Sequence, residues 1–217
     1  MSLIFKILLL IVAYLLGSIP SAVWIGKRFY DVDIREHGSG NSGFSNMVRV
    51  LGWKAGLPVF LIDAIKGYIA VNLIRVTQLY IPGTADFVSF QLLLAAAAVL
   101  GHIFPIYVGF KGGKGVATLL GILIAIQPQP TLICIGIFVV VFLTTRYVSL
   151  SSMIAGIAFP ILIIFVFKTT ISSLIIFSMI ISILLLLTHQ KNIERLLNKE
   201  ESRAKIVRRR NKSAEIE

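Results

Sequence analysis

The stretch VATLLGILIAIQPQPTLICIGIFVVVFLTT, residues 116–145, contains no charged residue and decides how the chain folds. Two apolar runs, 116–127 and 131–145, lie on either side of the prolines in QPQP. Proline cannot continue a helix, and it biases the residue before it towards extended geometry. We therefore predict two separate helices joined by a tight turn at QPQP, although each run is shorter than the ~20 residues that a helix needs to cross a bilayer.

Further apolar runs flank this pair on both sides. They cover residues 3–25, 56–76, 87–108, 150–167 and 171–188. The chain of 217 residues has a mean hydropathy of +0.90 and only 14% charged residues. This composition is typical of a protein that crosses a membrane several times, and not of a soluble domain. The first run shows no cleavage site, so we expect a retained helix. The sequence thus predicts an all-α integral membrane protein, a bundle of seven transmembrane helices.

The basic residues indicate which helix ends share one side of the membrane. Of the 21 lysines and arginines, only Lys6, Arg75 and Lys168 fall on the side of the N-terminus. Cytoplasmic segments carry the excess of lysine and arginine, so we predict the N-terminus outside and the C-terminus in the cytoplasm. Topology then accounts for the net charge of +11, and we expect no nucleic-acid partner. We predict a membrane domain over residues 1–198 and a basic, disordered tail over 199–217, near anionic lipid headgroups.

Two glycine-rich loops fall at predicted cytoplasmic helix ends. The first glycine loop, GSGNSG at residues 38–43, has the GxGxxG spacing of phosphate-binding turns. The second glycine loop, GFKGGKG at residues 109–115, is not a P-loop, because Val108 and Gly115 stand where that motif needs glycine and serine or threonine. It still leads into an apolar helix with Lys114 at its start, where backbone amides, the helix dipole and the lysine favour an anion. The alternative is a basic loop that only anchors the membrane surface.

Few other side chains suggest chemistry. His189 and Asn192 lie three positions apart, so they should share one face of a helix. His102 is as compatible with polar packing at a helix end as with ligand binding. Asp63 and Lys66 also lie three positions apart, and we expect a structural ion pair inside the bundle. No set of histidine, cysteine or carboxylate residues has metal-binding spacing, so we predict no metal site.

Longer motifs follow one another in a fixed order: GSGNSGFSNMVRVLG, GHIFPIYVGFKGGKGVAT, RYVSL and HQKNIERLL. They resemble the signature motifs of the bacterial acyl-phosphate:glycerol-3-phosphate acyltransferases, the PlsY family, over residues 15–197. The resemblance implies a seven-helix enzyme of the bacterial cytoplasmic membrane with its active site at the cytoplasmic face. Such an enzyme transfers a fatty acyl group from acyl phosphate to the 1-hydroxyl of sn-glycerol 3-phosphate, giving lysophosphatidic acid and phosphate. It implies no cofactor, and its partners are the two substrates and membrane lipid; no protein partner can be inferred.

The resemblance also assigns site residues. Glycerol 3-phosphate would be bound by Ser39, Arg49, Lys114, His189 and Asn192. Acyl phosphate would be bound by Gly40, Asn41, Ser45, Asn46, Gly112, Gly113 and Ser149. The catalytic residues would be Ser39, Lys114 and His189. Where the family commonly has GATN, this chain has GFSN, so Phe44 and Ser45 stand at the alanine and threonine positions.

The implied reaction needs little from the protein besides positioning. Acyl phosphate is an activated mixed anhydride, so direct attack by the glycerol hydroxyl requires no covalent serine intermediate. The proton passes either to His189 or to a phosphate of a bound substrate, whose second pKa is about 6; we favour the phosphate. The alternative function is a membrane transporter or binding protein for an organic phosphate. The one-sided polar motifs and the lack of an inverted repeat argue against it, because transporters bind substrates near the membrane midplane.

Overall fold

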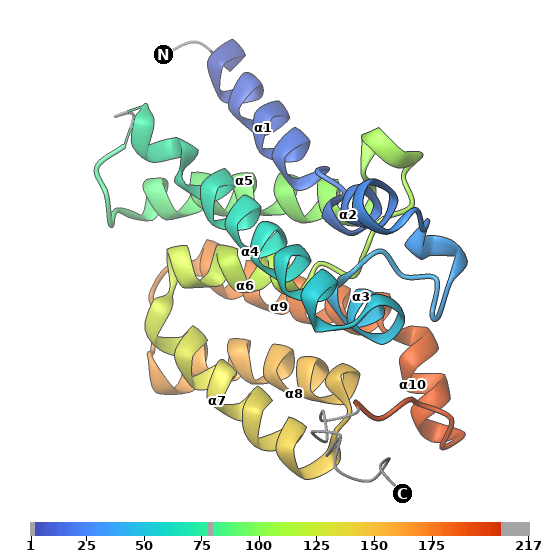
Figure 1. Cartoon of the computed structure of the whole chain (residues 1–217). Coiled ribbons are helices and arrows are strands. Elements are labelled where there is room, and N and C mark those ends of the chain that lie inside the picture. The colour runs from blue at the N-terminus through green and yellow to red at the C-terminus, as the bar shows by residue number, and fades with distance from the viewer. Residues whose placement is uncertain (1–2, 78–79, 205–217) are drawn as a thin grey trace, which may run out of the picture.

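The computed structural model describes residues 3–77 and 80–204 of the 217. Over these residues the chain is helical and has no β-strand (Figure 1). The α-helices are α1 (Leu3–Gly17), α2 (Ser21–Tyr30), α3 (Phe44–Leu51), α4 (Trp53–Val76), α5 (Ala85–Ile103), α6 (Val116–Ile126), α7 (Pro128–Thr145), α8 (Val148–Ile161), α9 (Ser172–Thr188) and α10 (Gln190–Leu197). The short elements are the 3-10 turns η1 (Ile34–Glu36) and η2 (Ile106–Val108) and the π-helical segment η3 (Leu162–Val166). The predicted all-α fold is confirmed.

By length and composition, four helices are suited to cross a membrane: α4, α5 with η2, α7, and α8 with η3. Two bent pairs, α1 with α2 and α9 with α10, raise the number to as many as six. α6 is apolar but has only 11 residues, and at 1.5 Å per residue it covers roughly half of the ~30 Å hydrocarbon core. Within the described ranges the structure therefore supports four to six spans, and the count of seven stays a prediction.

The first predicted helix, residues 3–25, is two helices in the structure. α1 and α2 meet at Pro20 with a bend of 41°. Proline lacks an N–H group and clashes with the preceding helical turn, so α1 cannot continue through it. α2 then runs past the predicted end to Tyr30, and it exposes Trp24 and Phe29. Exposed aromatic side chains of this kind are typical of the membrane–water interface.

The junction at QPQP is tighter than the sequence predicts. Gln127 alone separates α6 from α7, and Pro128 is the first residue of α7. The first position of a helix has no N–H partner to lose, and the fixed φ of proline suits it. The prediction of two helices holds, but the prediction that the prolines form the turn is wrong, because they begin the second helix.

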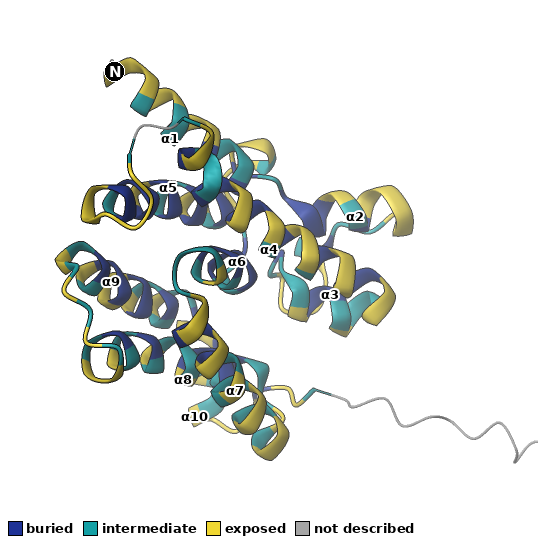
Figure 2. Ribbon diagram, turned by 90° about the vertical axis from the view of Figure 1, so that its left-hand side faces the viewer, coloured by how far each residue is buried: buried dark blue, intermediate teal, exposed yellow. Residues whose placement is uncertain are grey.

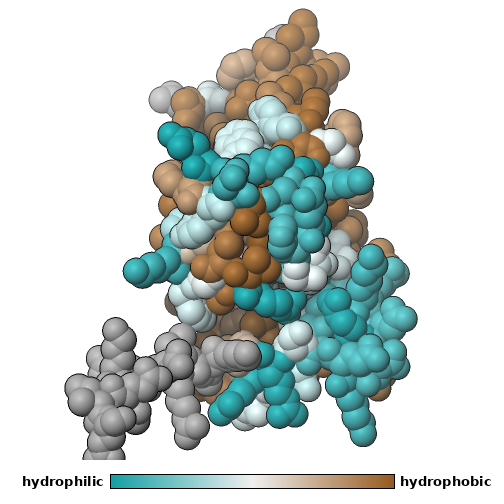
Figure 3. Space-filling view, turned by 45° about the vertical axis from the view of Figure 1, so that its right-hand side comes forward, coloured by the Kyte–Doolittle hydropathy of each residue, from teal (hydrophilic) through white to brown (hydrophobic). Residues whose placement is uncertain are grey.

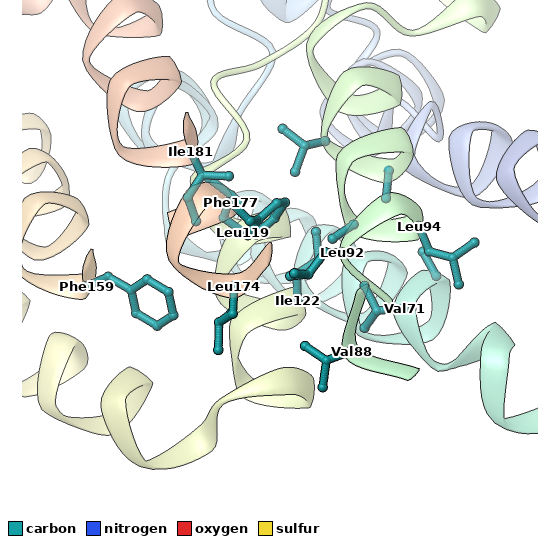
Figure 4. Packing of buried hydrophobic residues seen from close by; sticks show 14 of the residues in the cluster. Val71, Val88, Leu92, Leu94, Leu119, Ile122, Phe159, Leu174, Phe177 and Ile181 are labelled. Carbon is teal, nitrogen blue, oxygen red and sulfur yellow. The ribbon is translucent and has the colours of Figure 1, made fainter. Parts of the chain in front are cut away.

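α4 and α6 pack closely at the centre of the bundle through glycine. A β-carbon on Gly67 of α4 would collide with the carbonyl oxygen of Thr118, and one on Gly121 of α6 would collide with that of Ala64. Small residues let helix backbones approach each other in a membrane. The buried apolar core draws side chains from α1 and from α4 to α9, and Figure 4 shows some of them. Figure 2 shows buried residues concentrated on α5 and α6, whereas α1 is largely exposed, as expected for a helix that faces lipid.

The polar motifs gather at one end of the bundle. Figure 1 shows α2, α3, α10 and the loop from α5 to α6 in its right-hand half, whereas the junction of α6 and α7 lies on the left. Figure 3 turns the right-hand side forward and shows its hydrophilic residues around a smaller apolar area. Arg35 donates a hydrogen bond of 2.9 Å to the carbonyl of Val108. This bond ties the segment before α3 to the segment before the second glycine loop.

Candidate active site

The second glycine loop places Lys114 at the start of α6. Gly115, the residue directly before α6, has a φ of +82°, a left-handed conformation that glycine adopts without steric cost. The ammonium group of Lys114 donates a hydrogen bond to the amide oxygen of Asn192 on α10. Two motifs that lie far apart in the sequence therefore meet at this point.

A carboxylate completes this meeting point. Glu201, in the segment after α10, is 9% exposed. Its Oε1 accepts hydrogen bonds from the Ser149 hydroxyl and the Asn192 amide, each over 2.7 Å, and its Oε2 accepts one from Arg195 over 2.9 Å. Burial opposes ionisation of this carboxyl group, but the three hydrogen bonds outweigh burial and lower the pKa of Glu201. We call Lys114, Ser149, Asn192, Arg195 and Glu201 the Glu201 cluster.

Sequence reasoning did not find Glu201 as a site residue. It placed Glu201 in the tail, residues 199–217, because that segment is polar and basic. The structure describes this segment as far as Ala204, whose N–H donates to the carbonyl of Arg146 over 2.9 Å. The remainder of the predicted disordered tail, residues 205–217, lies outside the described residues. The only sign of a site in this sequence segment is a pair of neighbouring carboxylates, Glu200 and Glu201, among basic residues. Two carboxylates exposed to solvent would give the same sequence pattern.

The Glu201 cluster carries more positive than negative charge. Glu201 pairs with Arg195 and also attracts Lys114 through its charge, and Arg49 on α3 is close enough to repel Lys114. Burial lowers the pKa of Lys114 to about 8, and repulsion by Arg195 and Arg49 adds to this effect, although Glu201 opposes it. An additional anion would offset the repulsion, so the cluster is suited to bind one.

His189 lies at the break between α9 and α10, beside the cluster. It is 3% exposed, and its Nδ1 donates to the carbonyl of Leu185 over 2.8 Å. This bond fixes the tautomer of the neutral ring, so the ring can accept a hydrogen bond only through Nε2. The charges of Lys114 and Glu201 both act on the ring. His189 therefore lies close enough to the cluster for both charges to reach its ring.

The first glycine loop is shaped by the side chain of Asn46. The amide oxygen of Asn46 accepts from the N–H of Ser39 over 2.9 Å, and its nitrogen donates to the carbonyls of Ile34 and His37 over 3.0 Å each. Gly38 has a φ of +61°, and a β-carbon there would collide with the Asn46 oxygen. Both amide hydrogens of Asn46 are engaged, so in this conformation Asn46 shapes the loop and has no hydrogen left for a ligand.

The structure joins only part of the predicted site. The predicted residues that it connects directly or through Glu201 are Lys114, Ser149 and Asn192. Within the described residues, five predicted site residues make no hydrogen bond to the cluster: Ser39, Gly40, Asn41, Ser45 and Asn46. Gly112 and Gly113 precede Lys114 in the loop, and Arg49 is exposed and acts on Lys114 through its charge.

Phe44, the departure from the family motif, is accommodated by aromatic residues of α4. Its ring centroid lies 5.6 Å from that of Trp53, in an edge-to-face arrangement, and 5.4 Å from that of Phe60. Aromatic pairs are favourable at such distances. Phe44 is the first residue of α3, so these contacts fasten α3, which carries Arg49, to α4.

Other predicted features have structural roles. The ion pair of Asp63 and Lys66 is confirmed, with 2.8 Å between Nζ and Oδ1 and both side chains buried. His102 is buried beside the Thr118 hydroxyl, at 3.1 Å, so the structure shows polar packing for it. Among the residues that the structure describes, no group of three or more histidine, cysteine, aspartate or glutamate side chains could hold a metal ion.

Comparisons with known proteins place the chain in a family. A family profile described as glycerol-3-phosphate acyltransferase matches residues 7–199 of the chain. The chain is 40% identical to the glycerol-3-phosphate acyltransferase of Chlorobium phaeobacteroides, over 93% of this chain and 97% of that protein. It is 41% identical to the glycerol-3-phosphate acyltransferase of Salinibacter ruber, over 89% of this chain and 90% of that protein.

Solved structures show the same relationship. The crystal structure of PlsY (YgiH), an integral membrane glycerol 3-phosphate acyltransferase, in its glycerol 3-phosphate form has a TM-score of 0.82 and 37% identity, over 92% of this chain and 96% of that chain. Its lysophosphatidic acid form has a TM-score of 0.78 and 36% identity, over 92% and 95% of the two chains. Profile, relatives and structures agree, and we conclude that the chain belongs to the glycerol-3-phosphate acyltransferase (PlsY) family of integral membrane enzymes.

Proposed function

We propose that this protein transfers a fatty acyl group from acyl phosphate to the 1-hydroxyl of sn-glycerol 3-phosphate, and releases lysophosphatidic acid and phosphate, in bacterial phospholipid biosynthesis. The observation that carries the proposal is the excess of positive charge at the Glu201 cluster, where Arg195 pairs with Glu201 and the charges of Arg195 and the nearby Arg49 both repel Lys114. Both proposed substrates carry phosphate. Charge-assisted hydrogen bonds from lysine and arginine are the common means of binding phosphate in proteins.

Glycerol 3-phosphate is assigned to the cationic side of the cluster. Its phosphate lies between Lys114 and Arg49, whose mutual repulsion it would offset. Asn192 and His189 hold the glycerol hydroxyls, and Ser39 contributes from the first glycine loop. Acyl phosphate is assigned to the two glycine loops and the start of α8, through Gly40, Asn41, Ser45, Asn46, Gly112, Gly113 and Ser149. Within this set, Asn46 acts through the loop that it shapes.

The proposed reaction is a direct displacement. The oxygen of the 1-hydroxyl attacks the acyl carbonyl carbon and forms the new ester bond, and the bond from that carbon to the phosphate oxygen breaks. Phosphate leaves with the electron pair, and a substrate phosphate takes the hydroxyl proton, because its second pKa of about 6 suits a base at neutral pH. His189 orients the hydroxyl through Nε2, and Lys114 and Ser39 stabilise the developing negative charge. The mixed anhydride is already activated, so no cofactor is required.

Donor specificity tests this proposal. We expect turnover with acyl phosphate and little or none with acyl-CoA, because neither glycine loop has the features of a nucleotide-binding loop. Dinucleotide-binding glycine loops follow a strand and open a helix, whereas the first glycine loop follows the turn η1 and its backbone is engaged with Asn46. The measurement compares initial rates of the purified protein with both donors of equal chain length. Comparable rates with acyl-CoA would contradict the proposal.

We also propose seven spans, with the N-terminus outside and the site at the cytoplasmic face. Single cysteines in a Cys134→Ala background test this topology in intact cells with an impermeant thiol reagent. Cysteines at Thr84 and Lys168, which are exposed at one end, should label, whereas those at Lys111 and Ser202, exposed at the other, should not. Labelling of Ser202→Cys from outside would mean that one short helix does not span.

The pKa of Lys114 predicts how activity depends on pH. Below about pH 8 Lys114 is an ammonium ion that attracts phosphate, and above it the side chain becomes neutral. We therefore expect kcat/KM for glycerol 3-phosphate to fall as pH rises from 8 to 10, approaching about tenfold per pH unit. In Lys114→Arg, whose guanidinium stays charged above pH 12, the decline should move to higher pH. An alkaline limb at the same pH in both proteins would show that another group causes it.

A further inference from the structure

A buried polar network lies between α2, α4 and α5, beneath the glycine loops. Asp63 of α4 accepts a hydrogen bond of 2.7 Å from the Ser21 hydroxyl of α2 and pairs with Lys66 over 2.8 Å. Lys66 also donates to the carbonyl of Ile19 over 2.7 Å. Polar groups buried in a membrane protein are costly unless they are paired. The proposed reaction uses none of these residues, so their presence calls for another role.

His102, near the end of α5, connects this network to the second glycine loop. On one side of the ring, Nδ1 lies 3.1 Å from the Thr118 hydroxyl and 3.8 Å from the Asp63 carboxylate. On the other side, Nε2 faces Gly113, where an added β-carbon would collide with it. The ring therefore fills the space directly under the backbone of the loop, one residue before Lys114.

Backbone hydrogen bonds hold the loop against the end of α5. The N–H of Gly112 donates to the carbonyl of Ile103 over 3.1 Å, and the N–H of Gly113 donates to the carbonyl of His102 over 3.2 Å. The path of the chain into Lys114 is thus fixed by contacts with two successive residues of α5. The His102 ring adds a side-chain contact to the same stretch, at Gly113.

A small cavity links the network to both glycine loops. The cavity has a volume of about 10 Å³, enough for roughly one water molecule. Its lining includes Ser42 of the first glycine loop, Gly112 and Gly113 of the second, and Asp63, Lys66 and His102 of the network. The same buried residues therefore support both loops to which we assign substrates.

We propose that His102 is a positioning residue for acyl transfer: its ring, held by Thr118, sets the second glycine loop at Gly113 and thereby sets the place of Lys114. The proposal rests on the proposed function, because the quantity that His102 controls is the contact of Lys114 with substrate phosphate. Lys114 is already oriented by Asn192. A displacement of about 1 Å in a positioned group can cost on the order of 100-fold in rate.

Kinetics of His102→Ala and Thr118→Val test the role. We expect His102→Ala to raise KM for glycerol 3-phosphate about tenfold or more, because Lys114 is displaced from the phosphate. Thr118→Val, which removes the hydroxyl and keeps the shape, should raise it less. A residue needed only for folding would lower the amount of active protein, and thus the maximal rate, and would leave KM unchanged.

Paired substitutions make the test specific to the contact with Gly113. Gly113→Ala should lower kcat/KM because its methyl group collides with the His102 ring, and His102→Ala in the same protein should recover about tenfold, since the methyl group then fits the vacated space. Gly112→Ala is the matched control. Its β-carbon would collide with the carbonyl oxygen of His102 and approach that of Ile103, which truncation of the ring leaves in place, so His102→Ala should give no recovery.

The outcomes separate this role from the proposed function. Activity of the wild-type protein with acyl phosphate tests the function by itself. If the wild type is active and KM for glycerol 3-phosphate is unchanged in His102→Ala, the positioning role is overturned. The role is also overturned if His102→Ala restores kcat/KM equally in Gly113→Ala and Gly112→Ala, or restores it in neither.

Discussion

Replacement of Lys114 by alanine is expected to lower kcat/KM for glycerol 3-phosphate by at least about 10- to 150-fold. In the proposed site Lys114 donates a charge-assisted hydrogen bond to the substrate phosphate, and such a bond contributes about 1.5–3 kcal/mol. At 1.4 kcal/mol per decade this contribution gives the stated range. The loss is larger if the phosphate stays in a half-buried site without its counter-charge. Arg49→Ala should fall in the same range, because Arg49 lies close enough to repel Lys114 and is proposed to bind the same phosphate.

Matched controls separate the site from general surface charge. Lys111 lies in the same glycine loop and is exposed, and, unlike Arg49, it has no charge effect on Lys114. Lys111→Ala should therefore keep nearly full activity, because solvent screens its charge. Arg49→Lys should restore little activity to that position, since an ammonium group cannot reproduce the planar fork of a guanidinium on phosphate. Near wild-type efficiency of both Lys114→Ala and Arg49→Ala in well-folded protein would contradict the site proposed here.

Glu201→Ala is expected to lower activity and thermal stability together. The substitution removes three hydrogen bonds and leaves Arg195 without its carboxylate partner. One charge-assisted bond of this kind contributes about 1.5–3 kcal/mol to the folded state, so the melting temperature should fall. We expect kcat/KM to fall by on the order of 100-fold, the cost of displacing a positioned group by about 1 Å. Asn192 loses the bond that orients it towards Lys114, which adds to the loss. Initial rates and the melting temperature of the purified protein check both effects.

The neighbouring carboxylate supplies the control for this variant. Glu200 is exposed and its side chain makes no hydrogen bond within the described part of the chain, so Glu200→Ala should behave as wild type in both measurements. Glu201→Gln keeps the shape and an acceptor oxygen, so it should retain more activity than Glu201→Ala. If Glu201→Ala and Glu200→Ala were equally active and equally stable, the hydrogen bonds of Glu201 would have no part in forming the site.

The apolar runs of the sequence predicted most of the helices because a lipid-facing helix must be apolar along its whole length. Breaks were harder to predict, because proline acts differently at different places. Pro20 separates α1 from α2, Pro128 begins α7, and Pro58 and Pro160 lie inside α4 and α8. Residue type alone cannot distinguish these cases, since neighbouring helices decide whether the missing hydrogen bond is tolerated. The short helix α3 is too polar for a hydropathy pattern to detect.

The candidate site was predicted where several residues form a motif, and missed where one residue acts alone. Lys114, Ser149 and Asn192 come from three separate motifs, and the structure places them together. Glu201 joins them from a polar segment with no periodic signal, so only the folded chain reveals its role. Asn46 stands in a motif, yet its hydrogen bonds to the first glycine loop depend on the folded backbone.

The most direct test of the proposed reaction gives the purified protein acyl phosphate and sn-glycerol 3-phosphate in sealed vesicles and follows both products. We expect lysophosphatidic acid and inorganic phosphate to form in equal amounts, and both to be lost in Lys114→Ala. The same vesicles report uptake of glycerol 3-phosphate, which an acyltransferase does not need. Protein-dependent uptake without either product would contradict the account and would identify a transporter.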